Sequence, residues 1–294
     1  HESERFYFRN PKLHWPDYLY KIFVRSPFQT QALKLQYLGK NYKGRPYWEK
    51  IIRYKPDLLM IVHFNAISPL LVKKIRETLS IPVAWWVMAD NAAVSRFDPF
   101  YGDLHTYCSH LFAADESWIS SIKLLGSAKI VYLPFAADLS LYYPMSLEKK
   151  YDIGLVANFS SQSPTIIHKG LILQKLCREG FKVRAVARGL KRFFNLFPEL
   201  EKLDLVDEFY QPPQVNEMYN QTKITLAVNN PQAKSDPAVR VVEVAASGNF
   251  QLAEYRENTE KLMGDSVVQF RTLDELIAQV KFYLANDGER ARLA

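Results

Sequence analysis

The chain has 294 residues, of which 48% are hydrophobic and 23% are charged, and its formal net charge is +7. This balance excludes a disordered or fibrous protein, and the length predicts two globular domains that each bury a core. The positive charge favours anionic partners such as nucleotide phosphates, but there is no long basic block of the kind that singles out nucleic acid.

Residues 1–56 are rich in aromatic side chains, and helices are predicted at about 18–42 and at 46–54. From Pro56 onward, apolar runs alternate with helical segments. The predicted strands are 57–64, 82–88, 110–114 and 130–133, and the predicted helices are 68–79 and 117–125. Strands that alternate with helices, without hairpin signals, predict a parallel sheet covered on both faces.

A second alternating series follows a proline-containing connection at 134–150. We interpret 139–150 as the linker between an N-terminal domain at 1–138 and a C-terminal domain at 151–294. The second series has predicted strands at 151–157, 181–186 and 224–228, and predicted helices at 165–178 and 272–286. The predicted fold class is therefore α/β, with two Rossmann-like domains that each contain a parallel sheet and are joined by the linker; the resemblance described below implies that they face each other across a cleft.

One short helix, at 236–248, is marked at both ends. Asp236 suits its N-cap and Pro237 its first position, and Gly248 suits the left-handed residue that ends a helix. Strands are predicted before it and from Phe250 onward, which completes one α/β unit. In such units ligands bind beyond the carboxyl ends of the strands, against helix N-termini.

Arg240 and Glu243 lie three residues apart on one face of this helix. The pair predicts either a weak surface ion pair or a site in which the arginine binds a phosphate and the glutamate a hydroxyl. Both interpretations stay open on the helix alone.

Several sequence motifs of known enzyme classes are missing, and their absence narrows the range of possible activities. The sequence has no G-x-G fingerprint, no P-loop, no G-x-S-x-G elbow and no Asp-x-Asp pair. His105, Cys108 and His110 crowd one segment and suggest zinc, but no distant residue completes a recognised ligand spacing. We therefore expect neither a metal nor another cofactor.

Polar residues instead follow the ends of the predicted strands in both halves. Each of them alone suits a turn or a cap as well as a ligand site, but their shared position predicts one cleft. The residues are Asn65, Asp90, Asn91 and Asp115 in the first half, and Asn158, Ser160, Arg188, Asn229, Asn230, Arg240, Glu243 and Gly248 in the second half.

Several segments resemble the GT-B glycosyltransferases. The run from Tyr132 to Asp138, followed by Tyr143-Pro144, resembles the hinge of that family, and Arg240-x-x-Glu243-x-x-Ala246-x-Gly248 resembles its donor-site helix. More narrowly, the chain resembles the spore-maturation-protein (CgeB-like) group over residues 45–294. That resemblance rests on Lys55-Pro56-Asp57, Trp86 with Asp90, the hinge, Tyr151-Asp152-Ile153, the donor-site helix, and the closing residues Leu276, Tyr283-Leu284-Ala285 and Glu289-Arg290.

The resemblance implies a glycosyltransferase of class EC 2.4 that moves a sugar from a nucleotide-diphosphate sugar to a glycan, cell-surface or secondary-metabolite acceptor without metal. By similarity, Glu243 binds the ribose hydroxyls and Arg240 binds the diphosphate. The strand-end residues of the second half line the donor side, and Asn65, Asn91 and Asp115 line the acceptor side. Asp90 is the candidate base, although a capping role suits it equally well.

The sequence departs from the family pattern at Ser235, where many retaining members carry a glutamate near the sugar. This departure keeps open an alternative, a non-catalytic nucleotide-sugar or glycan-binding protein on the same scaffold. The first strand and glycine-rich turn that the family carries are also not evident, and the sequence stops shortly after the last predicted helix, where the group usually continues. We therefore expect a chain truncated at both ends.

No run of 18 apolar residues occurs, so no membrane span is predicted. Cys108 and Cys177 lie in different halves and are predicted to be buried thiols of a reducing compartment. With no signal peptide in view, we expect a cytoplasmic protein, either free or in peripheral contact with an acidic membrane surface.

Overall fold

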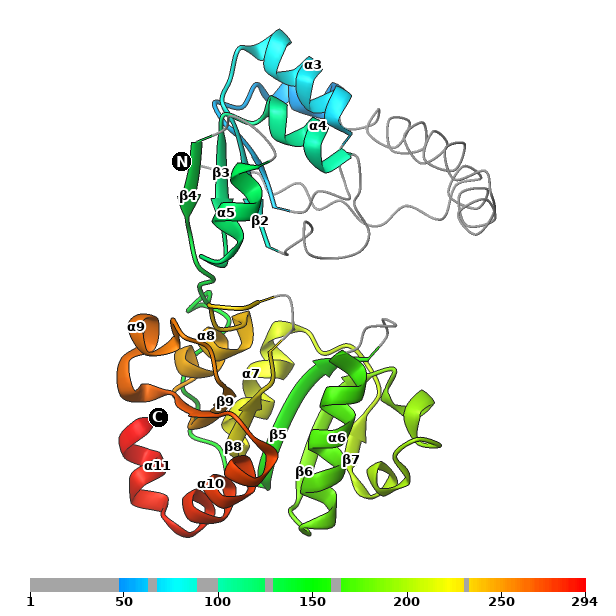
Figure 1. The fold of residues 1–294 in the computed structure, drawn as a ribbon, viewed down its shortest axis with the longest axis vertical. Coiled ribbons are helices and arrows are strands. Elements are labelled where there is room, and N and C mark those ends of the chain that lie inside the picture. The colour runs from blue at the N-terminus through cyan, green and yellow to red at the C-terminus, as the bar shows by residue number, and fades with distance from the viewer. Residues whose placement is uncertain (1–47, 63–67, 89–99, 125–128, 160–164, 230–232) are drawn as a thin grey trace. The chain divides into compact units, whose positions relative to one another are not determined.

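The computed structural model describes residues 48–62, 68–88, 100–124, 129–159, 165–229 and 233–294 (Figure 1). The chain divides into two compact units, His1–Leu133 and Pro134–Ala294. The helix predicted at 18–42 lies outside the described residues, whereas residues 48–54 are helical. No helix of the described segments is both long and apolar enough to cross a membrane.

The first unit contains a parallel sheet with strand order β1-β2-β3-β4. Its strands are β1 (Leu59–Ile61), β2 (Val83–Val87), β3 (His110–Ala113) and β4 (Lys129–Tyr132), connected through α3 (Pro69–Leu79), α4 (Phe100–Tyr107) and α5 (Trp118–Lys123). The predicted cap of α3 is confirmed, because Ser68 Oγ accepts a hydrogen bond from the N–H of Leu71 and Pro69 is the first helical residue.

The second unit is built on a six-stranded sheet, all parallel, with order β10-β9-β8-β5-β6-β7. The strands are β5 (Tyr151–Asn158), β6 (Val183–Arg188), β7 (Asp204–Val206), β8 (Thr222–Ala227), β9 (Gln251–Glu254) and β10 (Val268–Phe270). When the strands are numbered in chain order within this unit, their order in the sheet is the Rossmann order 3-2-1-4-5-6. The side of the sheet to which successive strands are added changes between β5 and β8. Ligands of such sheets bind beyond the carboxyl ends of the two strands at the reversal.

Helices cover both faces of this sheet (Figure 1). The helices are α6 (Thr165–Arg178), α7 (Pro212–Asn220), α8 (Val239–Ala246), α9 (Thr259–Met263), α10 (Leu273–Ala285) and α11 (Asp287–Leu293), with three 3₁₀ turns at Leu190–Phe193, Pro198–Lys202 and Gly264–Ser266. Along β6, Ala185 and Ala187 pack with α6 and α10, whereas Val186 packs with α7 and α8 on the other face. Because helices cover β6 on both faces, its side chains are apolar on both faces.

The start of α8 corrects the sequence prediction. The helix begins at Val239 with Ala238 as its N-cap, and Asp236 does not cap it. The Asp236 carboxylate instead accepts hydrogen bonds from Ser235 Oγ at 2.9 Å and Asn258 Nδ2 at 3.3 Å. The side-chain oxygen of Asn229, just after β8, accepts the Ala238 N–H at 2.9 Å and so supplies the cap from a distance.

The segment interpreted as the linker, 139–150, packs on the second unit. Asn216 Oδ1 accepts the N–H of Tyr143 at 3.2 Å, and Asn220 Oδ1 accepts the N–H of Met145 at 2.8 Å. Both asparagines belong to α7, so this helix holds the segment by its main chain. The boundary between the compact units falls earlier, after Leu133. A hinge within 134–150 stays a prediction.

Gly248 ends α8 as predicted, with φ +60°. A Cβ atom at this position would lie 2.8 Å from Pro144 Cγ, so both the backbone and the contact require glycine.

We expect Gly248→Ala to lower the free energy of unfolding by about 2 kcal/mol or more, because left-handed backbone alone costs about 1–2 kcal/mol for alanine. Gly180→Ala is the matched control, since Gly180 has φ +83° with open space around its Cβ position. Urea unfolding of both variants isolates the Pro144 contact. Equal losses of unfolding free energy in the two variants would show that a small shift of Pro144 relieves its contact with the added Cβ atom.

Candidate functional site in the second unit

The reversal of strand order places several segments around one edge of the sheet. Asn158 ends β5, Asn229 follows β8, and the helices α6 and α8 come after these two strands. A crevice at such an edge is lined by strand ends and by the first turns of the following helices. The side chains at this edge therefore decide what the second unit can bind.

Arg240, in the first turn of α8, contributes one cation. Its Nη1 donates to Glu243 Oε2 at 2.7 Å and lies 3.4 Å from the hydroxyl of Tyr219. The arginine side chain is 33% exposed and that of Glu243 only 12%, so this is a largely buried pair. The structure thus shows the predicted ion pair, with Glu243 more buried than a surface pair requires, and the phosphate role of Arg240 stays a prediction.

The positive charge of Arg240 is fixed by its surroundings. Burial by itself would lower the pKa of Arg240, but Tyr219 and Glu243 raise it above its ordinary value. Burial and then Glu243 raise the pKa of the neighbouring Tyr142 to about 12. Arg240 therefore stays a cation and Tyr142 a neutral hydroxyl at any physiological pH.

Lys169, in the second turn of α6, is a residue that the sequence interpretation missed. It is only 8% exposed, and it has no hydrogen bond or ion pair with any residue in the described part of the chain. Its pKa is lowered by burial and by the charge of Arg240, against an opposing effect of Glu254. A buried ammonium without an anion is costly unless a ligand supplies one.

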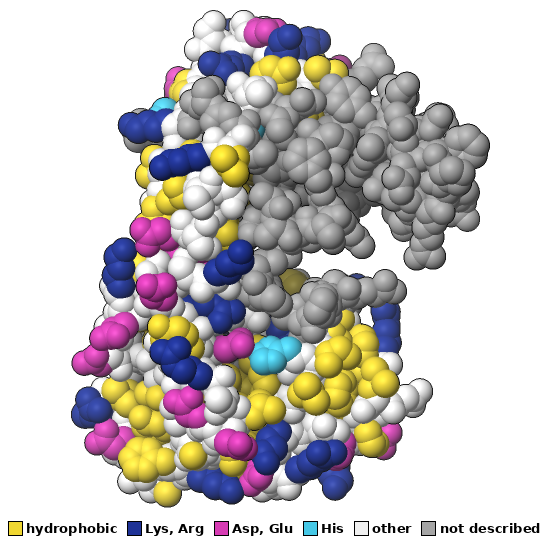
Figure 2. All heavy atoms as spheres, viewed as in Figure 1, with side chains coloured by type: hydrophobic (Ala, Val, Ile, Leu, Met, Phe, Trp, Pro, Cys, Tyr) yellow, Lys and Arg dark blue, Asp and Glu magenta, His cyan; other side chains and the backbone are white. Residues whose placement is uncertain are grey.

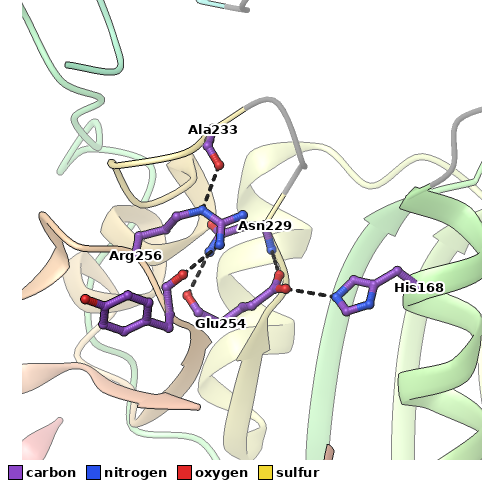
Figure 3. Close-up of polar contacts among 6 residues, drawn as sticks. His168, Asn229, Ala233, Glu254 and Arg256 are labelled. Atoms are coloured by element: carbon purple, nitrogen blue, oxygen red, sulfur yellow. Dashed lines mark hydrogen bonds and ion pairs between the residues drawn. The ribbon is translucent and has the colours of Figure 1, made fainter. Parts of the chain in front are cut away.

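Glu254, the last residue of β9, ties these elements together (Figure 3). Its Oε1 lies 3.0 Å from His168 Nε2, and its Oε2 accepts the N–H of Asn229 at 3.0 Å. Asn229 returns a hydrogen bond from Nδ2 to the carbonyl of Glu254 at 2.8 Å. Arg256 holds the segment between β8 and α8, because its Nε donates to the carbonyl of Ala233 at 2.7 Å. The carboxylate is thus held between α6 and the end of β8.

The predicted donor-side residues have different surroundings in the structure. Asn229 is buried, and both ends of its amide bond to the chain, so its side chain positions α8 and β9. Asn158 and Arg188 are register partners with exposed side chains at the ends of β5 and β6. Gly248 lies at the end of α8 opposite to Arg240. Ser160 and Asn230 lie outside the described residues.

On the acceptor side, only Asp115 is described. It is buried, and its Oδ1 accepts the N–H of Ser117 at 2.9 Å, which is the turn geometry that the sequence left open as an alternative. Asn65, Asp90 and Asn91 lie outside the described residues.

The segment that suggested zinc is apolar in its surroundings. His105 is buried with both ring nitrogens unpartnered, burial raises the pKa of Cys108 to about 12, and His110 Nδ1 lies 3.2 Å from Ser109 Oγ. In the segments that the structure describes, no group of three potential metal ligands occurs.

Solved structures match the chain over most of its length. The HepE protein of Anabaena in complex with UDP-glucose superposes with a TM-score of 0.59 at 13% identity, covering 84% of this chain and 75% of HepE. An α,α-trehalose-phosphate synthase (UDP-forming) of Burkholderia vietnamiensis gives 0.61 at 9% identity, covering 94% and 74%. The fold is that of the GT-B glycosyltransferases.

The pneumococcal O-GlcNAc transferase GtfA, solved with UDP and GlcNAc, shares the GT-B fold with a TM-score of 0.53 at 12% identity, over 84% of this chain and 54% of its own. In sequence, residues 171–294 match the family described as glycosyl transferase-like. No curated protein matches the chain in sequence. The narrower resemblance to the CgeB-like group is not confirmed.

Proposed function

We propose that the protein is a glycosyltransferase that moves a sugar from a nucleotide-diphosphate sugar to a glycan, cell-surface or secondary-metabolite acceptor. The observation that carries the proposal is Lys169, a buried ammonium without a partner among the described residues, beside Arg240 at the strand reversal. A diphosphate is the anion that two neighbouring cations and a helix N-terminus suit. The family match of residues 171–294 and the fold support the same activity. Because HepE was solved with UDP-glucose and GtfA with UDP, we propose that the donor is a uridine-diphosphate sugar.

The chemistry of transfer requires that the nucleotide diphosphate leaves with its charge neutralised. Lys169 and Arg240 supply fixed positive charges, which is the preorganised stabilisation that speeds such a departure. Glu243 Oε2 accepts hydrogen bonds from Arg240 and Tyr219, and we propose that its other oxygen accepts a ribose hydroxyl of the donor. We propose that these cations make the reaction independent of metal.

The charged side chains on one described face of the second unit form no equivalent cluster of cations (Figure 2). On the face of the second unit shown in Figure 2, basic and acidic side chains are interspersed. An interspersed surface gives weak general attraction for anions and no specific site. Specific binding is therefore assigned to the edge of the sheet.

The second candidate is a binding protein without turnover, and Ser235 is the residue that favours it. Its hydroxyl donates to Asp236 at 2.9 Å, at the position where many retaining relatives carry a sugar-binding glutamate. A serine hydroxyl that already donates to Asp236 offers fewer hydrogen bonds to a sugar than a carboxylate with two acceptor oxygens does.

Incubating the full chain with a panel of nucleotide sugars and sugar acceptors separates the two functions. The transferase predicts release of the nucleoside diphosphate and a glycosylated product, with and without a chelator. Saturable nucleotide-sugar binding without hydrolysis or transfer would support the binding protein. Absence of binding by every donor would contradict both the transferase and a nucleotide-sugar-binding protein, and would leave a glycan-binding protein.

A further inference from the structure

His168 lies one residue before Lys169 and is fixed by Glu254 rather than left mobile (Figure 3). Its Nε2 is 3.0 Å from Glu254 Oε1, and its side chain is about half exposed. Its other nitrogen, Nδ1, has no partner among the residues described. A carboxylate on one side of an imidazole sets the ring orientation and favours its protonated form.

The same contacts tie His168 to the candidate diphosphate site. Glu254 Oε2 binds the main chain of Asn229, and Asn229 Oδ1 in turn holds the N–H of Ala238 at the start of α8. His168 thus belongs to one hydrogen-bonded network with the helix N-terminus that we propose binds phosphate. It is also the only histidine in residues 134–294 of the sequence.

We propose that protonated His168 is a third cation for the donor diphosphate, with Nδ1–H directed to a phosphate oxygen and Glu254 as its positioning residue. This inference rests on the proposed function. It adds to Lys169 and Arg240 a cation that titrates near neutral pH, so the pH decides how firmly the donor is held.

The charges around His168 set the direction of the pH effect. The hydrogen bond that His168 donates to Glu254 raises the pKa of His168, whereas burial, Lys169 and Arg256 lower it, and the balance is a raised pKa. The charge of Arg240 lowers the pKa of Lys169, whose own charge acts on His168. Donor affinity is therefore complete below the pKa of free His168 and is lost as the pH rises through the higher pKa of the donor-bound form.

The test is a calorimetric titration of the full chain with UDP-glucose at several pH values from 5.5 to 8.5. Both phosphates of this probe are esterified, so its own charge is constant over that range, unlike that of UDP. We expect wild-type affinity to fall about tenfold over the range, which is the loss of one charge-assisted contact of about 1.4 kcal/mol. His168→Gln should bind at pH 5.5 as weakly as wild type does at pH 8.5.

Two further variants test the roles separately. Glu254→Gln should move the fall in affinity to lower pH, because the neutral amide no longer supports the imidazolium. His110→Gln, in the first unit, should leave the profile unchanged. The NMR signal of His168, assigned among the six histidines of the full chain by its loss in His168→Gln, also reports the titration, and UDP-glucose should raise its pKa.

Each outcome is decisive. A His168→Gln protein that binds UDP-glucose like wild type at every pH overturns the inference and leaves the proposed function standing. A wild-type protein that binds neither UDP-glucose nor any other nucleotide sugar overturns the proposed function and the inference with it.

Discussion

Lys169→Met is expected to weaken UDP binding by about tenfold to a hundredfold and, at the same time, to make the protein more stable. The affinity falls because one charge-assisted contact to a phosphate, worth about 1.5–3 kcal/mol, is lost. Stability rises by about 1 kcal/mol because methionine fills the same space, which is 8% exposed, without a buried unpaired charge. Calorimetric titration with UDP and urea unfolding without ligand measure the two effects.

Lys223→Met is the matched control for this prediction. Lys223 pairs with Asp152 at 2.9 Å, at the amino ends of β8 and β5 and so at the opposite edge of the sheet. Its replacement should leave UDP binding unchanged. If Lys169→Met instead lowered stability and bound UDP normally, Lys169 would be a structural residue and the diphosphate site would lie elsewhere.

Arg240→Lys is expected to weaken UDP binding by about tenfold to over a hundredfold, although the charge is kept. A lysine ammonium is a compact charge on a flexible stem, so it does not reproduce the fixed planar fork with which the guanidinium can bond to Glu243 and to phosphate oxygens. One charge-assisted contact of about 1.5–3 kcal/mol is lost for the diphosphate. Uridine lacks phosphate, so its affinity should change much less.

Arg184→Lys is the control with the same kind of surroundings. Arg184 also bonds to a carboxylate, that of Asp204, and to a tyrosine hydroxyl, that of Tyr210, but near the amino end of β6. Its replacement should leave both affinities unaltered. Arg240→Lys with wild-type affinity for UDP would remove the phosphate role of this arginine.

The sequence predicted the α/β class and the longer elements, because apolar runs and capped helices are strong local signals. The short strands β7 and β10, of three residues each, were missed because they are too short to show a period. The helix α7 was missed although it carried a signal, since Gln211 and Gln214 form a capping box and Pro212 is its first residue. The start of α8 was predicted to be capped by Asp236, but Asn229 accepts the N–H of Ala238 instead. This is a tertiary contact, which cannot be predicted from the residues next to the helix.

The site was predicted in part. The Arg240 and Glu243 pair was found from helical spacing, and their contact is confirmed by the structure. Glu254 follows the same strand-end rule that selected Asn229, so it could have been found. Lys169 and His168 could not, because only the sheet order brings the N-terminal ends of α6 and α8 to the same edge of the sheet, and a lysine in an amphipathic helix otherwise suggests an exposed side chain.

The central claim is that the carboxyl edge of the second sheet binds the diphosphate of a nucleotide sugar. Titrating the full chain with uridine, UMP and UDP at one pH and one salt concentration tests it most directly. The account predicts weak binding of uridine and a gain of tenfold or more from UMP to UDP, about 1.4 kcal/mol or more. That gain should shrink in Lys169→Met. Equal affinities for uridine and UDP would contradict the claim.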